Sequence, residues 1–255
     1  MTPEPLPLTV ACWDYDRTAP LIDRRIPLEG CAPRFTILPP QVVFPRAFTN
    51  AEWDVSELSL SRHAQSVAMG THHYAGLPIF LSRAFRHGSI YIRTDRGIDN
   101  PAGLRGRRIG LRNFDDTAVV VVRGMLRDQY GLGPADVVWV VGDMEPGGPA
   151  RVAPPPLHAP IPLDRLANGD TLDAALVEGR LDGLIALRPP PCFVLGHPGV
   201  GRLFTDWCRA EQDYHRATDL FPIMHLVGVR ASLAADTHPR CPDNAVAVGA
   251  GHVRG

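Results

Sequence analysis

The stretch SRAFRHGSIYIR, residues 82–93, places Arg83, Arg86 and His87 directly before an apolar alternation. An arginine guanidinium binds a carboxylate through two parallel N–H donors, and a molecule with two carboxylates needs two such partners. Arg83 and Arg86 are three residues apart, so in a helical or irregular turn both can face one ligand. The alternative is a solvated entry to a strand, which is the commoner role of a charge cluster. The stretch therefore predicts either an anion site or a solvated edge.

A second histidine, His225, lies in the apolar stretch FPIMH. A histidine in such a strand is most often part of the core, and this interpretation stays open. If the chain forms two lobes, the strands that cross between them line the cleft. His87 precedes one candidate crossing strand and His225 lies in the other. Because the reference pKa of histidine is about 6.5, the two side chains together predict proton transfer in one cleft.

Hydroxyl side chains stand at two predicted helix starts. Ser59 and Ser61 precede one helix, and Thr117 precedes another. Their simplest role is helix capping, but the free N–H groups of a helix start also bind anions. One such start in each lobe would allow a dicarboxylate to bridge the lobes. Asp115 and Asp116 argue against a strongly anionic ligand at the second start.

Aromatic and acidic side chains follow the first predicted strands. Trp13 and Tyr15 come directly after a strand, and ligands of open α/β sheets bind at that end. Either ring can stack on an aromatic ligand, although a core tryptophan and a surface tyrosine explain the pattern equally well. Asp54 and Glu57 form either a carboxylate pair or a salt bridge between one of them and an arginine.

Apolar runs and turn residues predict alternating strands and helices. Strands are expected at Leu8–Trp13, Phe35–Leu38, Val55–Leu60, Ser89–Arg93, Arg108–Leu111, Val137–Val141, Leu184–Leu187 and Ile223–Val229. Helices are expected at Tyr15–Ile26, Ser61–Met69, Pro101–Leu104, Thr117–Tyr130, Asp170–Glu178 and Leu203–Thr218. This alternation is typical of α/β proteins with mostly parallel sheets. A Pro-rich stretch at 145–162 separates two βα series and predicts two lobes.

Four stretches together resemble a known family. NPAGLRGRRIGL and LVEGRLDGLIALRPP resemble the turns that open and close the second lobe of the type II periplasmic-binding-protein fold, with Gly103 and Gly183 at positions that usually hold Asp and Ala. SRAFRHGSIYIRTDRGI and ATDLFPIMHLVGVR resemble the 4,5-dihydroxyphthalate decarboxylase family, which uses this fold. The resemblance implies a first lobe at 1–89 plus 226–255, a second lobe at 90–225, and two crossing strands.

Composition bounds the partners. The chain has 255 residues and a formal net charge of −1, so no global field attracts nucleic acid or an anionic membrane. All basic residues are arginine, and the five cysteines form no C-x-x-C pair. No signal peptide and no membrane-length apolar run are evident. We expect a reduced, cytoplasmic protein with a small aromatic acid as its partner, and homo-oligomer formation is left open.

The resemblance implies a decarboxylase of a dihydroxylated aromatic dicarboxylate. The expected catalytic residues are His225, as the acid that protonates the ring carbon, and His87. The expected substrate-binding residues are Arg83, Arg86, Ser59, Ser61, Trp13 and Thr117. No cofactor is predicted. His72 and His73 have no third ligand at metal spacing, so they do not predict a metal site. A divalent metal is nevertheless left open.

Two other functions stay open. One is a binding protein for a small organic acid on the same fold, because fold alone does not decide function. The other is an inactive paralogue, because the stretch after Pro239, RCPDNAVAVGAGHVRG, lacks the helical period that the resemblance leads one to expect there. We expect this tail to pack poorly and to leave apolar surface of the first lobe exposed.

Overall fold

The computed structural model describes residues 4–146 and 161–237. Most of the Pro-rich stretch and the whole of the tail after residue 237, including its expected poor packing, lie outside the described residues. The chain divides into two compact units. Unit 1 comprises Met1–Arg83 and Ile223–Gly255, and unit 2 comprises Ala84–Pro222. These boundaries lie a few residues before the lobe boundaries expected from the sequence.

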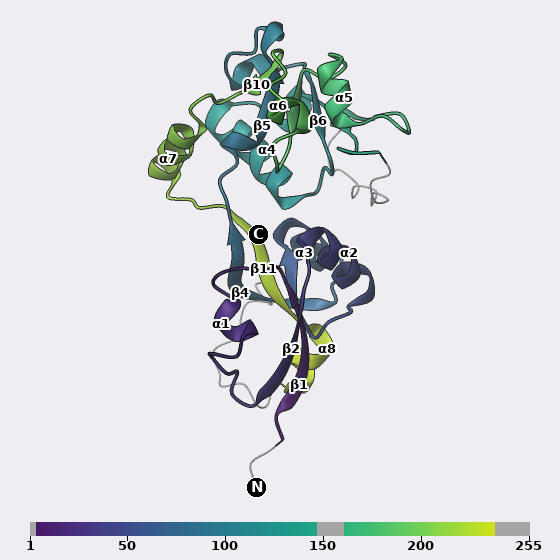
Figure 1. Cartoon of the computed structure of the whole chain (residues 1–255), viewed down its shortest axis with the longest axis vertical. Helices are drawn as coiled ribbons and strands as arrows, with labels where there is room; N and C mark the ends of the chain where they lie inside the picture. Colours follow the sequence, from purple (N-terminus) through teal and green to yellow (C-terminus); the bar gives the residue numbers. More distant parts are fainter. Residues whose placement is uncertain (1–3, 147–160, 238–255) are drawn as a thin grey trace, which may run out of the picture. The chain divides into compact units, whose positions relative to one another are not determined.

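Strands and helices alternate along the chain, and Figure 1 follows their order by colour. The strands are β1 Leu6–Cys12, β2 Cys31–Ile37, β3 Val55–Ser59, β4 Tyr74–Arg83, β5 Ile90–Arg93, β6 Arg108–Leu111, β7 Val138–Val141, β8 Leu163–Arg165, β9 Gly183–Ile185, β10 Val200–Arg202 and β11 Ile223–Arg230. The α-helices are α1 Ala19–Ile22, α2 Pro40–Asn50, α3 Leu60–Ala68, α4 Thr117–Tyr130, α5 Leu172–Val177, α6 Pro191–Val194, α7 Trp207–Thr218 and α8 Ala231–Thr237. The 3₁₀ turns are η1 His87–Ser89, η2 Thr94–Arg96, η3 Pro101–Leu104 and η4 Pro134–Asp136.

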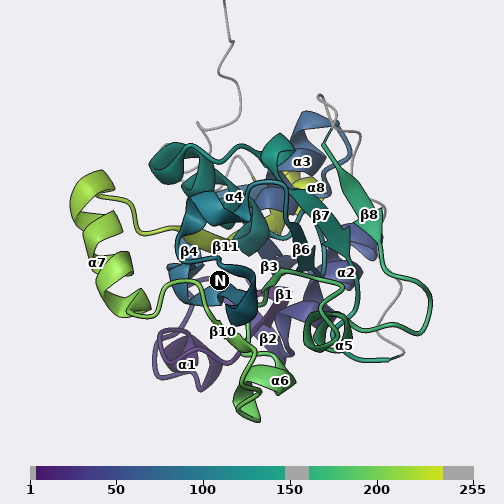
Figure 2. The ribbon, with the colours of Figure 1, turned by 90° about the horizontal axis from the view of Figure 1, so that it is seen from above.

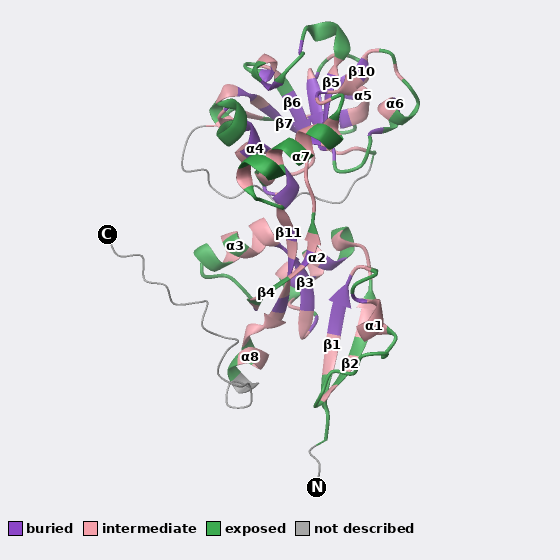
Figure 3. Ribbon diagram, turned by 90° about the vertical axis from the view of Figure 1, so that its left-hand side faces the viewer, coloured by how far each residue is buried: buried purple, intermediate pink, exposed green. Residues whose placement is uncertain are grey.

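Unit 1 is built on a five-stranded sheet in the order β2-β1-β3-β11-β4. β1 is parallel to β2 and β3, whereas β11 runs antiparallel to both β3 and β4. Leu58 and Leu226 point from neighbouring strands into a core that α2 closes with Val43 and Ala47. Figure 3 shows β3 and the upper part of β1 as buried. The sheet therefore brings the carboxyl ends of β1 and β3 to one edge, where β11 begins.

Unit 2 is built on a six-stranded sheet in the order β10-β5-β9-β6-β7-β8. Its strands β5, β6 and β7 are almost wholly apolar, as expected for strands covered on both faces. α4 packs Val122 and Leu126 against Trp139 of β7 in the larger of two apolar cores. A Cβ on Gly110 of β6 would lie 2.7 Å from Leu181, so glycine is required for this close packing. In the view of Figure 2, α7 and β8 lie on opposite sides of the unit.

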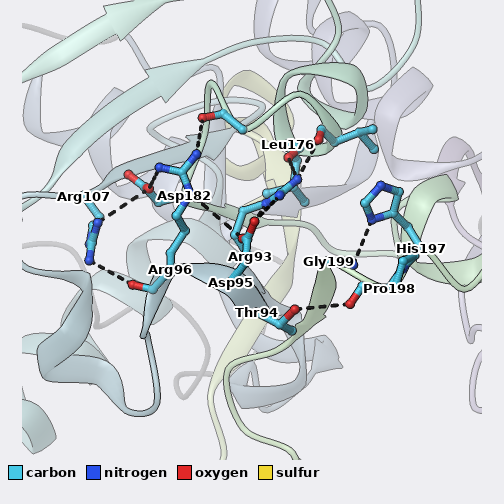
Figure 4. A network of polar contacts seen from close by, with 12 residues as sticks. Arg93, Thr94, Asp95, Arg96, Arg107, Leu176, Asp182, His197, Pro198 and Gly199 are labelled. Atoms are coloured by element: carbon cyan, nitrogen blue, oxygen red, sulfur yellow. Dashed lines mark hydrogen bonds and ion pairs between the residues drawn. The ribbon is translucent and has the colours of Figure 1, made fainter.

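An arginine network ties the loops of unit 2 together (Figure 4). Arg93 pairs with Asp95 at 2.5 Å and donates to the carbonyl of Val177 at 2.6 Å. Arg96 and Arg107 both approach Asp182, at 3.7 and 3.8 Å. These side chains satisfy carbonyl and carboxylate groups of the scaffold, so their role in unit 2 is structural.

Several predicted elements agree closely with the structure, including β6, α4 and η3, whose bounds match. Several elements were not predicted, and the two longest of them are α2 and β4. Both contain prolines, which in the sequence look like breaks in a helix or strand. Pro40 occupies the first helical turn, where its missing N–H costs nothing, and Pro78 lies in an edge strand, where a lost ladder bond is tolerated.

Some details of the sequence prediction are wrong. Ser59, and not Ser61, is the residue that precedes α3, and Asp116, not Thr117, is the residue that precedes α4. The sheets are also less parallel than expected, because β11 in unit 1 and β5 in unit 2 run antiparallel to their neighbours. Both strands follow the points at which the chain passes from one unit to the other. The simple βα alternation ends at these points.

Candidate active site

Polar side chains gather at one edge of the sheet of unit 1. In the register of β11, His225 lies opposite Ser59 of β3 and opposite Ser82 of β4. The register slips on both sides of His225 against β4, as at a β-bulge. Bulges redirect side chains and are frequent beside active sites. Trp13 and Tyr15 follow β1 at the same edge, so residues from four separate strands meet there.

Glu57 of β3 holds His225 by a direct contact. The Nδ1 atom of His225 lies 2.6 Å from Oε1 of Glu57. The Glu57 side chain is fully buried, while that of His225 keeps 18% of its surface exposed. A carboxylate accepts hydrogen bonds but cannot donate them, so the Nδ1 atom must carry the proton. The tautomer of the neutral ring then leaves Nε2 as the open nitrogen.

Two more donors complete the environment of the Glu57 carboxylate. The hydroxyl of Tyr15 donates to Oε1 at 2.6 Å, and the backbone N–H of Trp13 donates to Oε2 at 2.8 Å. The Tyr15 oxygen also lies 3.4 Å from Nδ1 of His225. Burial, together with the hydrogen bond to Glu57, raises the pKa of Tyr15, against an opposing hydrogen bond from Ser82. Tyr15 therefore stays a neutral donor across the physiological pH range.

Apolar side chains shield the pair. The ring of Phe44, from α2, meets the ring of His225 edge-on with 4.9 Å between centroids. Burial, with the Glu57 charge nearby, raises the pKa of Cys12 to about 11, so this thiol is not a nucleophile at neutral pH. The described part of the chain offers Nε2 of His225 no hydrogen-bond partner. That nitrogen is therefore available to a ligand.

His87 of unit 2 has the opposite environment. It is 1% exposed, and both of its ring nitrogens lack a hydrogen-bond partner among the described residues. Its ring packs against Phe204 at 5.1 Å and Tyr214 at 5.3 Å. Burial lowers the pKa of His87 to about 4, so the ring is neutral at physiological pH. Unpaired buried polar groups destabilise a fold and are rare without a functional reason.

Two curated relatives in sequence identify the family. The chain is 43% identical over 239 residues to 4,5-dihydroxyphthalate decarboxylase of Comamonas testosteroni, covering 93% of this chain and 72% of that protein. It is 42% identical over 212 residues to 4,5-dihydroxyphthalate decarboxylase of Pseudomonas putida, covering 83% of this chain and 82% of that protein. The chain belongs to the 4,5-dihydroxyphthalate decarboxylase family. No profile of an established family matches the sequence.

Solved structures show which fold this member of the decarboxylase family adopts. The periplasmic aliphatic sulphonate-binding protein SsuA of Escherichia coli superposes with a TM-score of 0.52 at 14% identity, over 93% of this chain and 69% of that one. The alkanesulfonate-binding protein SsuA of Xanthomonas axonopodis pv. citri, bound to MOPS, gives 0.51 at 13% identity, over 93% and 70%. At such identities the likeness shows the fold alone. The fold is α/β and periplasmic-binding-protein-like, as the sequence predicts.

The predicted site residues of this decarboxylase-family chain fall into two groups. Unit 1 holds His225, Trp13, Ser59, Ser61 and Arg83. Ser59 is 4% exposed beside His225, with its hydroxyl 3.5 Å from that of Ser61. Trp13 is half-buried, and its backbone rather than its ring contacts the pair. Arg83 ends β4 and is exposed, with its guanidinium 5.1 Å from the centre of the Phe80 ring.

Unit 2 holds the remaining three predicted residues, which are Arg86, His87 and Thr117. Burial lowers the pKa of Arg86, while the charge of Glu211 opposes the shift. Thr117 is buried in the first turn of α4, directly after Asp116. The predicted pairing of His87 with His225 joins the two units and stays a prediction.

Glu57 and Tyr15 are the residues that the sequence prediction undervalued. Asp54 binds elsewhere, accepting from Thr9 at 2.6 Å and pairing with Arg230 at 3.3 Å, so it forms no carboxylate pair with Glu57. A signal was available, because a glutamate inside an apolar strand needs a buried partner. Among the described residues, His225 of β11 is that partner, and the pairing needs the antiparallel register of β11 on β3.

The described residues contain no group of three or more His, Cys, Asp or Glu side chains arranged to hold a metal ion. Within those residues, no helix is both long enough and apolar enough to span a membrane. Cys12, Cys31, Cys192 and Cys208 are all free thiols, and Cys241 lies outside the described residues.

Proposed function

We propose that this chain is a carboxy-lyase that removes one carboxylate from 4,5-dihydroxyphthalate or a close dihydroxylated aromatic dicarboxylate. The observation that carries the proposal is the 2.6 Å contact between His225 and Glu57, in a chain that belongs to the decarboxylase family. This contact leaves Nε2 of an oriented imidazole open, which is what proton transfer to a ring carbon requires.

The chemistry needs one proton. His225 in its protonated form gives the Nε2 proton to the ring carbon that bears the leaving carboxylate. The hydroxyl para to that carbon supplies electron density and stabilises the cationic ring that forms. The bond between the ring and the carboxylate then breaks, its electron pair restores the aromatic ring, and CO₂ leaves. The neutral histidine regains a proton from water, so the sum is one dicarboxylate and one proton giving 3,4-dihydroxybenzoate and CO₂.

Arginines hold the substrate carboxylates in this proposal. Arg83, whose planar guanidinium lies beside Phe80, has the geometry to bind a carboxylate with two parallel bonds. Arg86 acts from unit 2, and Ser59, Ser61 and Thr117 offer hydroxyl groups. Trp13 packs against the substrate ring. The reaction needs no organic cofactor, and the enzyme works in the cytoplasm.

The second candidate is a binding protein for a small organic acid, which the fold shared with the sulphonate-binding proteins favours. The two functions differ in their products. A binding protein would show saturable binding of 4,5-dihydroxyphthalate with no CO₂ and no change in the ring protons.

The test is incubation of the purified chain with 4,5-dihydroxyphthalate in D₂O, followed by CO₂ release and proton NMR. We expect 3,4-dihydroxybenzoate with deuterium at the vacated carbon. His225→Gln should lower kcat by about 10²–10⁴-fold while substrate binding survives. His63→Gln is the matched control, because His63 is a half-buried histidine of α3 in the same unit and should leave kcat unchanged. Full activity in His225→Gln would remove His225 from the chemistry.

A further inference from the structure

We propose that Glu57 and Tyr15 are positioning residues of the decarboxylation site, which together decide where the proton sits on the His225 ring. The inference rests on the proposed function for its kinetic consequences, but not for its structural ones. Neither residue is assigned a role by the family relationship.

Glu57 cannot act on the substrate itself. Its side chain is fully buried, so no ligand reaches it. Its two oxygens accept from Tyr15, from His225 and from the backbone of Trp13. All three of these groups direct a proton at the carboxylate, so Glu57 is the acceptor in each contact. Glu57 therefore acts through His225, by keeping a proton on Nδ1 and directing Nε2 outward.

Tyr15 acts on the same carboxylate oxygen. Both the Tyr15 hydroxyl and Nδ1 of His225 lie 2.6 Å from Oε1 of Glu57. Two donors on one oxygen share its negative charge, so each bond is weaker than it would be alone. Without the Tyr15 hydroxyl, the whole charge at Oε1 acts on the histidine. Tyr15 thus limits how strongly Glu57 retains a positive charge on His225.

Substituting Glu57 by glutamine should move the proton of the neutral His225 ring from Nδ1 to Nε2. A glutamine has one oxygen, and the Trp13 N–H must still be accepted in a buried place. If the oxygen accepts from Trp13, the amide NH₂ faces His225, and Nδ1 must become an acceptor. The neutral ring then carries its proton on Nε2. The opposite orientation sets two buried N–H donors face to face and costs more.

The first experiment is ¹⁵N NMR of the full-length protein labelled at histidine, with the His225 signals assigned by their loss in His225→Gln. In the parent protein above neutral pH, we expect the proton on Nδ1. In Glu57→Gln, we expect it on Nε2. A proton that stays on Nδ1 in Glu57→Gln would overturn the role of Glu57. This readout needs no decarboxylation, so it separates the inference from the proposed function.

The second experiment is steady-state kinetics against pH. Glu57→Gln should lower kcat by about 10²–10⁴-fold with a smaller effect on KM, as for other catalytic histidines placed in the wrong tautomer. Tyr15→Phe should keep kcat within about tenfold but move the loss of activity at high pH upward, by up to about one pH unit. The direction follows because a less shared carboxylate stabilises the protonated, active ring.

Matched controls come from the same unit. Asp54→Asn removes a carboxylate that also accepts a backbone N–H, that of Thr9 at 2.8 Å, outside the cluster. Tyr74→Phe removes a buried hydroxyl that donates to the Trp53 carbonyl at 2.9 Å. Both should leave kcat and its pH profile unchanged. If Glu57→Gln fails to fold, Tyr15→Phe still decides, because an unmoved pH profile in that variant overturns the shared-oxygen arrangement.

Discussion

At the scale of single residues, two histidines of one chain illustrate opposite uses of burial. His225 is partly exposed and held by a buried carboxylate, whereas His87 is sealed among aromatic rings with both nitrogens unpaired. The first arrangement fixes the orientation of the ring. The second destabilises the fold whenever the ring gains a proton. The burial of His87 therefore predicts a pH dependence of the free energy of unfolding.

The sign of this dependence follows from the lowered pKa of His87. Below about pH 6.5 an unfolded histidine binds a proton, but the folded ring stays neutral down to about pH 4. The free energy of unfolding should thus fall as the pH drops from about 6.5 to about 4. Above about pH 6.5, His87 should add no pH dependence to the free energy of unfolding. His87→Phe removes the titrating group and the unpaired nitrogens while keeping a ring in the pocket.

We therefore expect His87→Phe to gain more stability over the parent at pH 5 than at pH 8, by about 2 kcal/mol. Thermal unfolding at both pH values checks this. A gain that is equal at the two pH values would show that His87 is not buried as a neutral ring.

At the scale of elements, two glycines differ in the space that a Cβ atom would find, one in a helix and one in a strand. Gly124 lies within α4 with nothing near its missing Cβ, so it only weakens the helix. Gly228 lies in β11, where a Cβ would meet Leu58 at 2.3 Å and Tyr74 at 3.0 Å. The first glycine is dispensable and the second is required by the packing of the sheet.

Gly124→Ala should stabilise the protein by about 0.5–1 kcal/mol, and Gly228→Ala should destabilise it by about 1–3 kcal/mol. Thermal unfolding of both variants, with decarboxylation measured alongside, tests the pair. Equal shifts of the same sign would contradict the packing of β11 against β3 and β4.

Local pattern predicted much of the fold and only part of the site. Strands and helices with uninterrupted apolar periods, such as β6 and α4, follow from sequence because burial imposes the period. The prolines of α2 and β4 look like breaks, and only their places in a first turn and on a sheet edge make them acceptable. His225 was predicted as a site residue. The role of Glu57 depends on the register of β11 on β3, which brings together residues 168 positions apart. No local pattern carries that information.

At the scale of the whole molecule, the two units differ in how the chain builds them. Unit 2 is one continuous segment, Ala84–Pro222, with apolar cores of its own. Unit 1 needs two segments, because β11 follows unit 2 in the sequence and lies between β3 and β4 in the sheet. The His225–Glu57 contact therefore forms only after the chain has closed this long loop.

This asymmetry predicts how fragments behave. A fragment of residues 84–222 should fold alone and unfold cooperatively, because its length is typical of a domain and its core is complete. A fragment of residues 1–83 should stay unfolded, because without β11 the strands β3 and β4 lose their shared partner. Near-UV circular dichroism reports both outcomes, because each unit has a buried tryptophan. Trp139 is buried in unit 2, with its indole N–H 2.7 Å from the Pro134 carbonyl, and Trp53 is buried in unit 1. A folded 1–83 fragment would mean that β11 is not what completes the sheet, and that the Glu57 side of the active site forms before His225 arrives.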